Sequence, residues 1–117
     1  MIIRIWRTEI ERAHMAKYEQ FAQERSLPMF RQQQGFLGVL FLGRQKDRAV
    51  LTVWRDLLAV EALAHSSTYQ ETSTELNATG WLVGQTSVEV FEVQGSFLDL
   101  QALAHLLEST NPEATPS

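Results

Sequence analysis

The sequence of 117 residues contains no cysteine, which excludes disulfide bonds, thiolate metal ligands and a cysteine nucleophile. A formal net charge of −4 argues against nucleic acid or an anionic membrane as the partner. A membrane-spanning helix needs about 20 apolar residues in succession, and no apolar run approaches that length. Charges at Arg4 and Arg7 leave no apolar signal-peptide core near the first residue. These absences favour a cytoplasmic globular protein, and the length fits one domain.

Two neighbouring apolar segments are the most informative feature that is present. Residues 35–43 read GFLGVLFLG and residues 49–54 read AVLTVW, without the alternation of a strand that has one wet face. Both strands are therefore expected to be buried on both sides. The predicted helices are too few to cover two faces of a sheet, so a partner subunit is expected to cover the second.

The remaining pattern predicts alternating strands and helices. Alternation over residues 2–7 places Ile3 and Ile5 on one face of a first strand, which can extend to Ile10. A helix is expected to begin between residues 9 and 13 and to end near Arg25, because Pro28 interrupts it. A further turn over 29–33 precedes the apolar segments. Three more strands are expected, over 36–43, 48–55 and 85–93. Three more helices are expected: one capped by Asp56, one from the break at 65–68 to Asn77 or Gly80, and one over 97–107.

The order βαββαβ predicts a fold of the α+β class. It is the ferredoxin-like arrangement, in which a four-stranded antiparallel sheet carries its helices on one face. Two such sheets packed face to face would cover the bare faces, which predicts a homodimer in the form of a dimeric α/β barrel. We expect this domain over 1–95, a C-terminal amphipathic helix over 96–108 and a disordered tail over 109–117.

Several local motifs resemble the antibiotic biosynthesis monooxygenase family of dimeric α/β barrels. They are the opening strand IIRIWR, the sequence QGFLG over 34–38, the sequence TVW over 52–54 and the sequence AHSSTY over 64–69. The resemblance covers residues 1–93. It implies the ferredoxin-like fold and a range of activities that includes oxygenation of aromatic polyketides without metal or flavin, the deprotonated substrate itself activating oxygen.

Other relatives in this family bind and degrade haem. They use an asparagine on the first strand, a tryptophan in the second helical region and a histidine about ten residues later. This sequence has its only asparagines at Asn77 and Asn111, and the matching positions hold Leu63 and Ser73. We therefore expect no haem degradation by that mechanism, and no cofactor.

His65 and Tyr69 are the candidate catalytic residues, because they flank the predicted helix break. An imidazole there could act as a base or hydrogen-bond donor near neutral pH, or it could close the end of the preceding helix. The Tyr69 phenol could bond to substrate or to backbone. A metal site needs about three convergent ligands, and the spacing of the three histidines supports none.

Five further residues are candidates for lining a substrate pocket. Each also has a structural interpretation, since a tryptophan can fill the core and a histidine on a helix stripe can lie at the core edge. An inward arginine needs a carboxylate, for which Glu89 or Glu92 is available, or an anionic substrate. The five are Arg4, Trp6, His14, Tyr18 and Trp54.

The sequence therefore leaves three functions open. The first is a small cofactor-independent oxygenase with a pocket between sheet and helices. The second is a dimer that binds a small hydrophobic or aromatic molecule without reaction, and the third is a structural dimer whose interior is filled by side chains. The lining of the largest cavity separates them.

Overall fold

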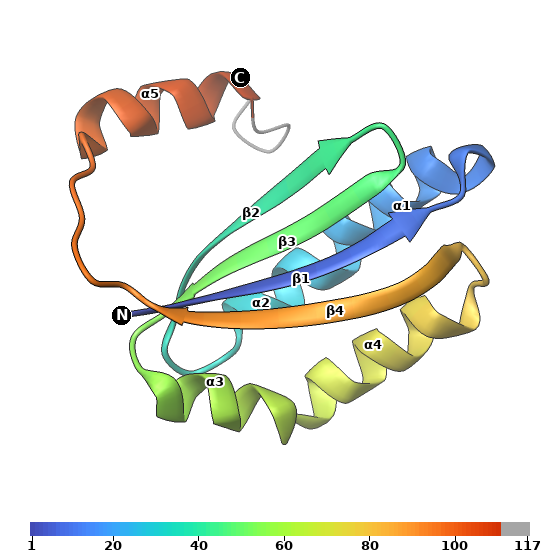
Figure 1. Ribbon diagram of the computed structural model, residues 1–117, viewed down its shortest axis with the longest axis horizontal. Helices are drawn as coiled ribbons and strands as arrows, with labels where there is room; N and C mark the ends of the chain where they lie inside the picture. Colours follow the sequence, from blue (N-terminus) through green and yellow to red (C-terminus); the bar gives the residue numbers. More distant parts are fainter. Residues whose placement is uncertain (111–117) are drawn as a thin grey trace.

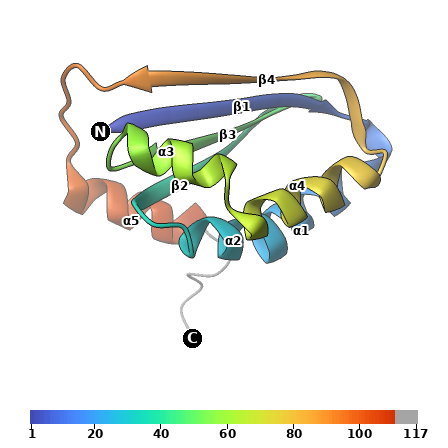
Figure 2. The ribbon, with the colours of Figure 1, turned by 90° about the horizontal axis from the view of Figure 1, so that it is seen from below.

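The computed structural model describes residues 1–110. Its centre is a four-stranded antiparallel sheet in the order β2-β3-β1-β4, with the helices that follow β1 and β3 on one face (Figures 1 and 2). This is the predicted ferredoxin-like α+β fold, which is confirmed. The strands are β1 (Ile2–Ile10), β2 (Phe36–Arg44), β3 (Asp47–Trp54) and β4 (Leu82–Glu92).

Strand β1 lies in the middle of the sheet, between β3 and β4. Its alternation directs Arg4 and Trp6 towards the helices and Ile3 and Ile5 towards the opposite face, which we call the open face. The strand extends to Ile10, the longer of the two predicted forms. Strand β1 therefore pairs along both of its edges and contributes side chains to both faces of the sheet.

The predicted hairpin joins β2 and β3. Gln45 has a positive φ of 54° and forms the tight turn with Lys46, while Asp47 already begins β3. On β2, Val39 and Phe41 face the helices and are partly buried, whereas the intervening Leu40 lies on the open face. The apolar run is thus covered on only one side within this subunit.

The helical segment after β1 differs from the prediction, because Pro28 does not interrupt it. A 3₁₀ turn (Arg12–His14) leads into α1 (Met15–Phe21), a π-helical turn (Ala22–Ser26) and α2 (Leu27–Arg31). Proline lacks an N–H and clashes with the carbonyl four residues earlier in a regular helix. That carbonyl lies in the wider π turn, which accommodates the ring while the chain stays helical.

Two capping side chains begin the helices that follow β3. Asp56 accepts a hydrogen bond from the Ala59 N–H at 2.9 Å and begins α3 (Leu57–Ala64). Ser66 accepts one from the Tyr69 N–H at 3.3 Å and begins α4 (Ser67–Ala78). Asp56 was predicted as a cap, and Ser66 lies within the break at 65–68 from which the next helix was predicted to start. Strand β4 then starts three residues earlier than expected.

The core lies between the sheet and the helices. Trp54 is fully buried and makes edge-to-face contacts with Phe30 and Phe36 at ring-centroid distances of 6.4 and 5.6 Å. Its indole N–H donates to the Thr52 hydroxyl at 2.7 Å, so the one polar atom of this ring is satisfied. The aromatic cluster fixes the helix before β2 against the end of the sheet.

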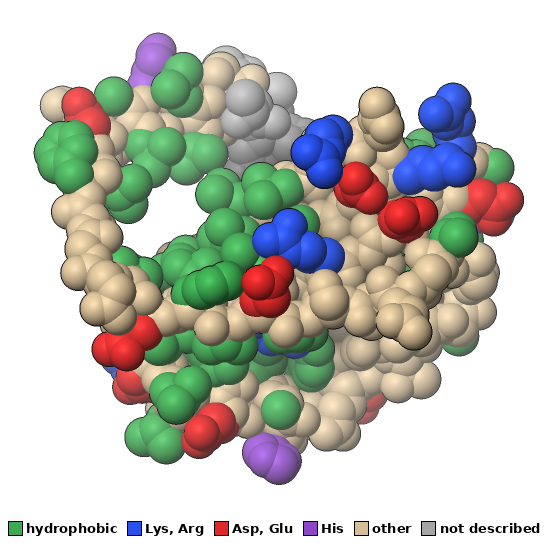
Figure 3. All heavy atoms as spheres, viewed as in Figure 1, with side chains coloured by type: hydrophobic (Ala, Val, Ile, Leu, Met, Phe, Trp, Pro, Cys, Tyr) green, Lys and Arg blue, Asp and Glu red, His purple; other side chains and the backbone are tan. Residues whose placement is uncertain are grey.

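The open face carries no helix in this subunit. Figure 3 views it, and green hydrophobic side chains gather over its strands with charged side chains beyond them. The apolar residues that alternation places there are Ile3, Ile5, Leu40, Leu42, Leu51, Val53 and Phe91.

The last described helix, α5 (Leu100–Thr110), begins later than the expected residue 96 and includes positions 109 and 110, which were assigned to the tail. The rest of the predicted tail, 111–117, lies outside the described residues. Within residues 1–110, no helix is long and apolar enough to cross a membrane.

Candidate functional site

A cavity of about 250 Å³ opens between the helix-bearing face of the sheet and the helices α1, α2 and α4. Four of the predicted site residues line it: Arg4, Trp6, Tyr18 and Tyr69. Most of the remaining wall is apolar or carries small hydroxyl and amide groups. Among residues 1–110, no histidine, aspartate or glutamate lines the cavity. The third reading of the sequence, an interior filled by side chains, is therefore not supported.

Arg4 is the most unusual residue of this cavity. It is only 8% exposed, yet no carboxylate among the described residues forms an ion pair with it. The predicted partner Glu89 instead pairs with Arg7 at 3.0 Å on the open face, because Arg4 and Arg7 point to opposite sides of β1. A buried guanidinium without a counter-charge is costly, so this cation has capacity for an anion from outside.

Tyr69 holds the Arg4 side chain in place. An Arg4 Nη2 hydrogen donates to the Tyr69 hydroxyl oxygen at 3.0 Å, and the guanidinium carbon lies 5.6 Å from the centre of the tyrosine ring. Since that oxygen already accepts a hydrogen bond, the Tyr69 O–H remains available as a donor. The pair therefore offers N–H and O–H donors to one acceptor in the cavity.

Tyr18 supplies a second phenol from helix α1. It is 4% exposed, and burial raises the pKa of Tyr18 to about 12. The nearby Arg48 lowers this pKa and Glu19 raises it, but both effects are smaller than that of burial. Tyr18 is consequently a neutral phenol at physiological pH, which can donate a hydrogen bond but cannot act as a base there.

Three of the predicted site residues do not line the cavity. Trp54 is fully buried in the aromatic core, which leaves it no surface for a substrate. His65 is exposed at the C-terminus of α3, where its backbone N–H bonds the Ala62 carbonyl at 3.1 Å. His14 stacks on Trp81 at 6.2 Å between ring centres, beyond the cavity wall. His65 therefore lies outside this cavity, and its catalytic role stays a prediction.

The sequence reasoning missed several polar groups that line the cavity. Ser73 and Asn77 face it from α4, one and two turns beyond Tyr69, and Thr86 faces it from β4. The sequence contains the signal, because Tyr69, Thr72 and Leu76 lie at helical spacing and indicate the inner side of that helix.

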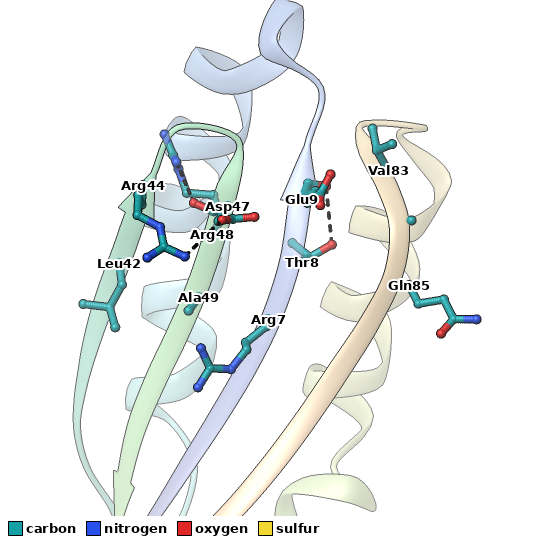
Figure 4. Close-up of a pocket in the computed structure, with 12 residues that line it drawn as sticks. Arg7, Thr8, Glu9, Leu42, Arg44, Asp47, Arg48, Ala49, Val83 and Gln85 are labelled. Atoms are coloured by element: carbon teal, nitrogen blue, oxygen red, sulfur yellow. Dashed lines mark hydrogen bonds and ion pairs between the residues drawn. The ribbon is translucent and has the colours of Figure 1, made fainter.

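A larger hollow of about 540 Å³ lies on the open face near the β2–β3 turn (Figure 4). The three arginines that line it are paired: Arg7 with Glu89 at 3.0 Å, Arg44 with Asp47 at 3.5 Å and Arg48 with Glu19 at 3.0 Å. The cations of this hollow therefore already have carboxylate partners. Across the described part of the chain, no three acidic or histidine side chains are grouped closely enough to hold a metal ion.

No family model matches the sequence, and no curated protein sequence matches it either. Solved structures do share its fold. SnoaB, a cofactor-independent oxygenase from Streptomyces nogalater, matches with a TM-score of 0.68 at 18% identity, covering 81% of this chain and 94% of its own.

Two further structures match as well. The monooxygenase ActVA-Orf6 from Streptomyces coelicolor, solved in complex with nanaomycin D, matches with a TM-score of 0.72 at 15% identity, covering 83% of this chain and 90% of its own. A putative antibiotic biosynthesis monooxygenase from Deinococcus radiodurans matches with a TM-score of 0.70 at 15% identity, covering 84% and 97%. At these identities the likeness shows a shared fold, and the fold that the sequence motifs implied is confirmed.

Proposed function

We propose that this protein is a small cofactor-independent monooxygenase that acts on aromatic or polyketide-like molecules in the cavity behind β1. The observation that carries the proposal is Arg4, a buried cation that has a tyrosine partner and no carboxylate. Such a group favours a ligand that binds as an anion, as an ionised phenol or enol does. The names of the matched structures support the reaction class, since they include a cofactor-independent oxygenase.

Arg4 and Tyr69 would bind the ionised oxygen of the substrate. Two donors directed at one oxygen stabilise the phenolate or enolate over its neutral form and lower its pKa in the site. The aromatic side chains of Trp6 and Phe30, which line the same cavity, would hold a planar ring. Tyr18, neutral at physiological pH, would add a hydrogen bond without competing for the proton.

The reaction consumes one molecule of oxygen for each substrate. The electron-rich carbon of the enolate adds to O₂ through one-electron transfer and radical recombination, which forms a carbon–oxygen bond and leaves a peroxide anion. The peroxide anion takes up the proton that was released when the substrate ionised, which gives a hydroperoxide. Loss of the remaining hydrogen on that carbon as a proton then breaks the O–O bond, the carbon becomes a carbonyl, and the departing hydroxide combines with this second proton to form water. The residues of this chain need only bind, orient and stabilise the anion.

A second function, binding without reaction, is favoured by one observation. The described part of the chain places no histidine or carboxylate in the cavity wall, and the buried phenol there has a raised pKa, so none of these lining groups removes a proton efficiently at neutral pH. A ligand that arrives already ionised could be held by Arg4 and released unchanged. Oxygen consumption distinguishes this binding protein from the monooxygenase.

The test uses an oxygen electrode and a panel of hydroxylated anthrones and naphthoquinols. Wild-type protein should consume one O₂ per substrate, and Arg4→Met should lower kcat/KM at least about 30-fold, the effect of losing a buried charge partner. Arg31→Met, which removes an exposed arginine of α2, is the control and should leave turnover unchanged. Tight binding without oxygen uptake would establish the binding protein instead, and neither binding nor uptake would refute both functions.

We also infer that two subunits form a homodimer through their open faces. The inference is supported by the apolar side chains on that face, of which Leu40, Leu42 and Phe91 are 43–49% exposed in the single subunit. Light scattering after size-exclusion chromatography tests it directly. A mass near twice the 13.3 kDa of the chain is expected, and a monomer at micromolar concentration would overturn it.

A further inference from the structure

The residues after β4 form a projecting segment, which we call the C-terminal arm (93–110). Its first seven residues have no helix or strand and can extend to about 24 Å. Asp99 then starts α5, since its carboxylate accepts a hydrogen bond from the Ala102 N–H at 3.0 Å. Leu100, Leu103 and Ala104 follow at helical spacing and give α5 an apolar side.

Large apolar side chains of the arm stay exposed when only residues 1–110 are considered. Phe97, Leu98 and Leu100 are 88%, 62% and 68% exposed. Figures 1 and 2 show α5 standing beyond the β2 edge of the sheet, and Figure 3 shows an open gap between the arm and that edge with hydrophobic side chains on both sides. A helix of this length is marginal in water by itself, so it depends on packing against another surface.

We propose that the C-terminal arm clasps a second copy of this chain, with the apolar side of α5 packed on the partner subunit. The inference rests on the homodimer proposed above, because the arm leaves the sheet at the end of β4, beside the open face. A partner that covers the open face would therefore also stand next to the gap. One occupant, the same chain, would satisfy both apolar surfaces.

The exposed area agrees with the size of a stable dimer interface. A large apolar residue has a full accessible surface of about 200 Å². Multiplying this area by the exposed fraction of each residue named below gives roughly 900 Å² of uncovered surface on the arm and the adjoining sheet. A standard interface buries about 800 Å² on each partner, and monomers rarely expose more than a few hundred in one patch. The residues included are Leu37, Leu40, Leu42, Phe91, Phe97, Leu98, Leu100 and Leu103.

The arm is also additional to the shared fold. The sheet and its helices are complete at Glu92. The matches cover 81–84% of this chain but 90–97% of the matched structures, so this chain has residues that those structures lack. The apolar residues of the arm therefore do not belong to the core that all these proteins need. A separate packing partner accounts for their chemistry.

The first test measures the dimer dissociation constant of the full chain by sedimentation equilibrium. The double variant Leu100→Asp/Leu103→Asp should weaken dimerisation at least tenfold while the far-ultraviolet circular dichroism keeps the signal of the sheet. Gln101→Asp adds a charge to the same helix one residue away from the apolar side, and it should leave the constant unchanged. Equal constants for all three proteins would overturn the clasp but not the open-face dimer, whereas a monomeric wild type would overturn both.

The second test asks which subunit the arm contacts, and the absence of cysteine makes it specific. Ala104→Cys places the only thiol on the apolar side of α5, and a benzophenone attached to it crosslinks on illumination. A mixture of nitrogen-14 and nitrogen-15 protein is crosslinked and digested for mass spectrometry. Peptide pairs of mixed isotope support the clasp. Pairs of one isotope only, which mean that the arm folds back on its own subunit, or no crosslinks at all, overturn it.

Discussion

Replacing Arg4 with methionine should make the free protein more stable and the site inactive. Methionine has a similar length and no charge, so it can fill the space of a residue that is 8% exposed. The substitution removes a buried cation without a carboxylate partner, whose desolvation costs several kcal/mol. The distinctive result is that stability rises while binding falls. If Arg4 were purely structural, its replacement would lower both the stability of the protein and its binding of the ligand.

The expected gain follows from the contacts that Arg4 makes. The hydrogen bond to Tyr69 at 3.0 Å and the ring contact at 5.6 Å together contribute roughly 1–3 kcal/mol. The half-buried Tyr69 hydroxyl can bond to water after the change, so no new unsatisfied group offsets the gain. A net stabilisation of about 1 kcal/mol remains, which corresponds to a rise in Tm of about 4 °C for a domain of this size.

Thermal unfolding followed by circular dichroism measures this change. The same samples are titrated with a hydroxylated anthraquinone, for which the loss of the cation should weaken binding at least about 30-fold. Arg31→Met should leave both the Tm and the affinity unchanged. If Arg4→Met lowers the Tm by several degrees, or binds the anionic ligand as well as the wild type does, then Arg4 is not an uncompensated charge and the reasoning is refuted.

Three other predictions concern single positions. Burial raises the pKa of Tyr18 to about 12 from an ordinary value near 10, so its contribution to the free energy of unfolding is fully present below pH 10 and is lost as the pH rises through 12. Urea unfolding across this range should show a loss of up to about 3 kcal/mol that Tyr18→Phe removes, and an unchanged profile would contradict it. Gly35 has a φ of +80° and a Cβ there would lie 2.5 Å from an alanine side chain of α3, so Gly35→Ala should cost about 2–4 kcal/mol in the same assay. Gly80→Ala, with a φ of +76° and open space around it, should cost only about 1 kcal/mol, and equal costs would rule out the clash. Tyr69→Phe should weaken binding of the anthraquinone about tenfold while His65→Ala leaves it unchanged, and the reverse order in a fluorescence titration would restore His65 to the site.

The order of elements and the caps could be predicted because they depend on local chemistry. Asp56 begins its helix as expected, and Ser66 begins the next one within the predicted break at 65–68, since a short polar side chain before a helical pattern satisfies the first free N–H groups. Pro28 misled the prediction because the same proline ends a regular helix and is tolerated after a π turn. That choice depends on how the neighbouring residues pack.

The site could be predicted only where strand alternation decided the direction of a side chain. Alternation along β1 placed Arg4 beside Trp6, and helical spacing brought Tyr69 towards them. His65 was misplaced because it follows the last turn of α3, where the rotation of the helix about its axis decides between cavity and solvent. Trp54 was ambiguous for a different reason, since only the packed structure shows which aromatic rings surround it.

Strand β1 separates the cavity from the open face, and its side chains alternate between the two. Arg4 and Trp6 line the cavity, while Ile3 and Ile5 lie on the open face, where the other subunit is proposed to bind. A slip of one position would exchange the two sets and destroy both surfaces at once. Insertion or deletion of one residue in β1 would therefore disturb the cavity and the proposed interface together, whereas substitutions on the helices that line the cavity would change its wall alone.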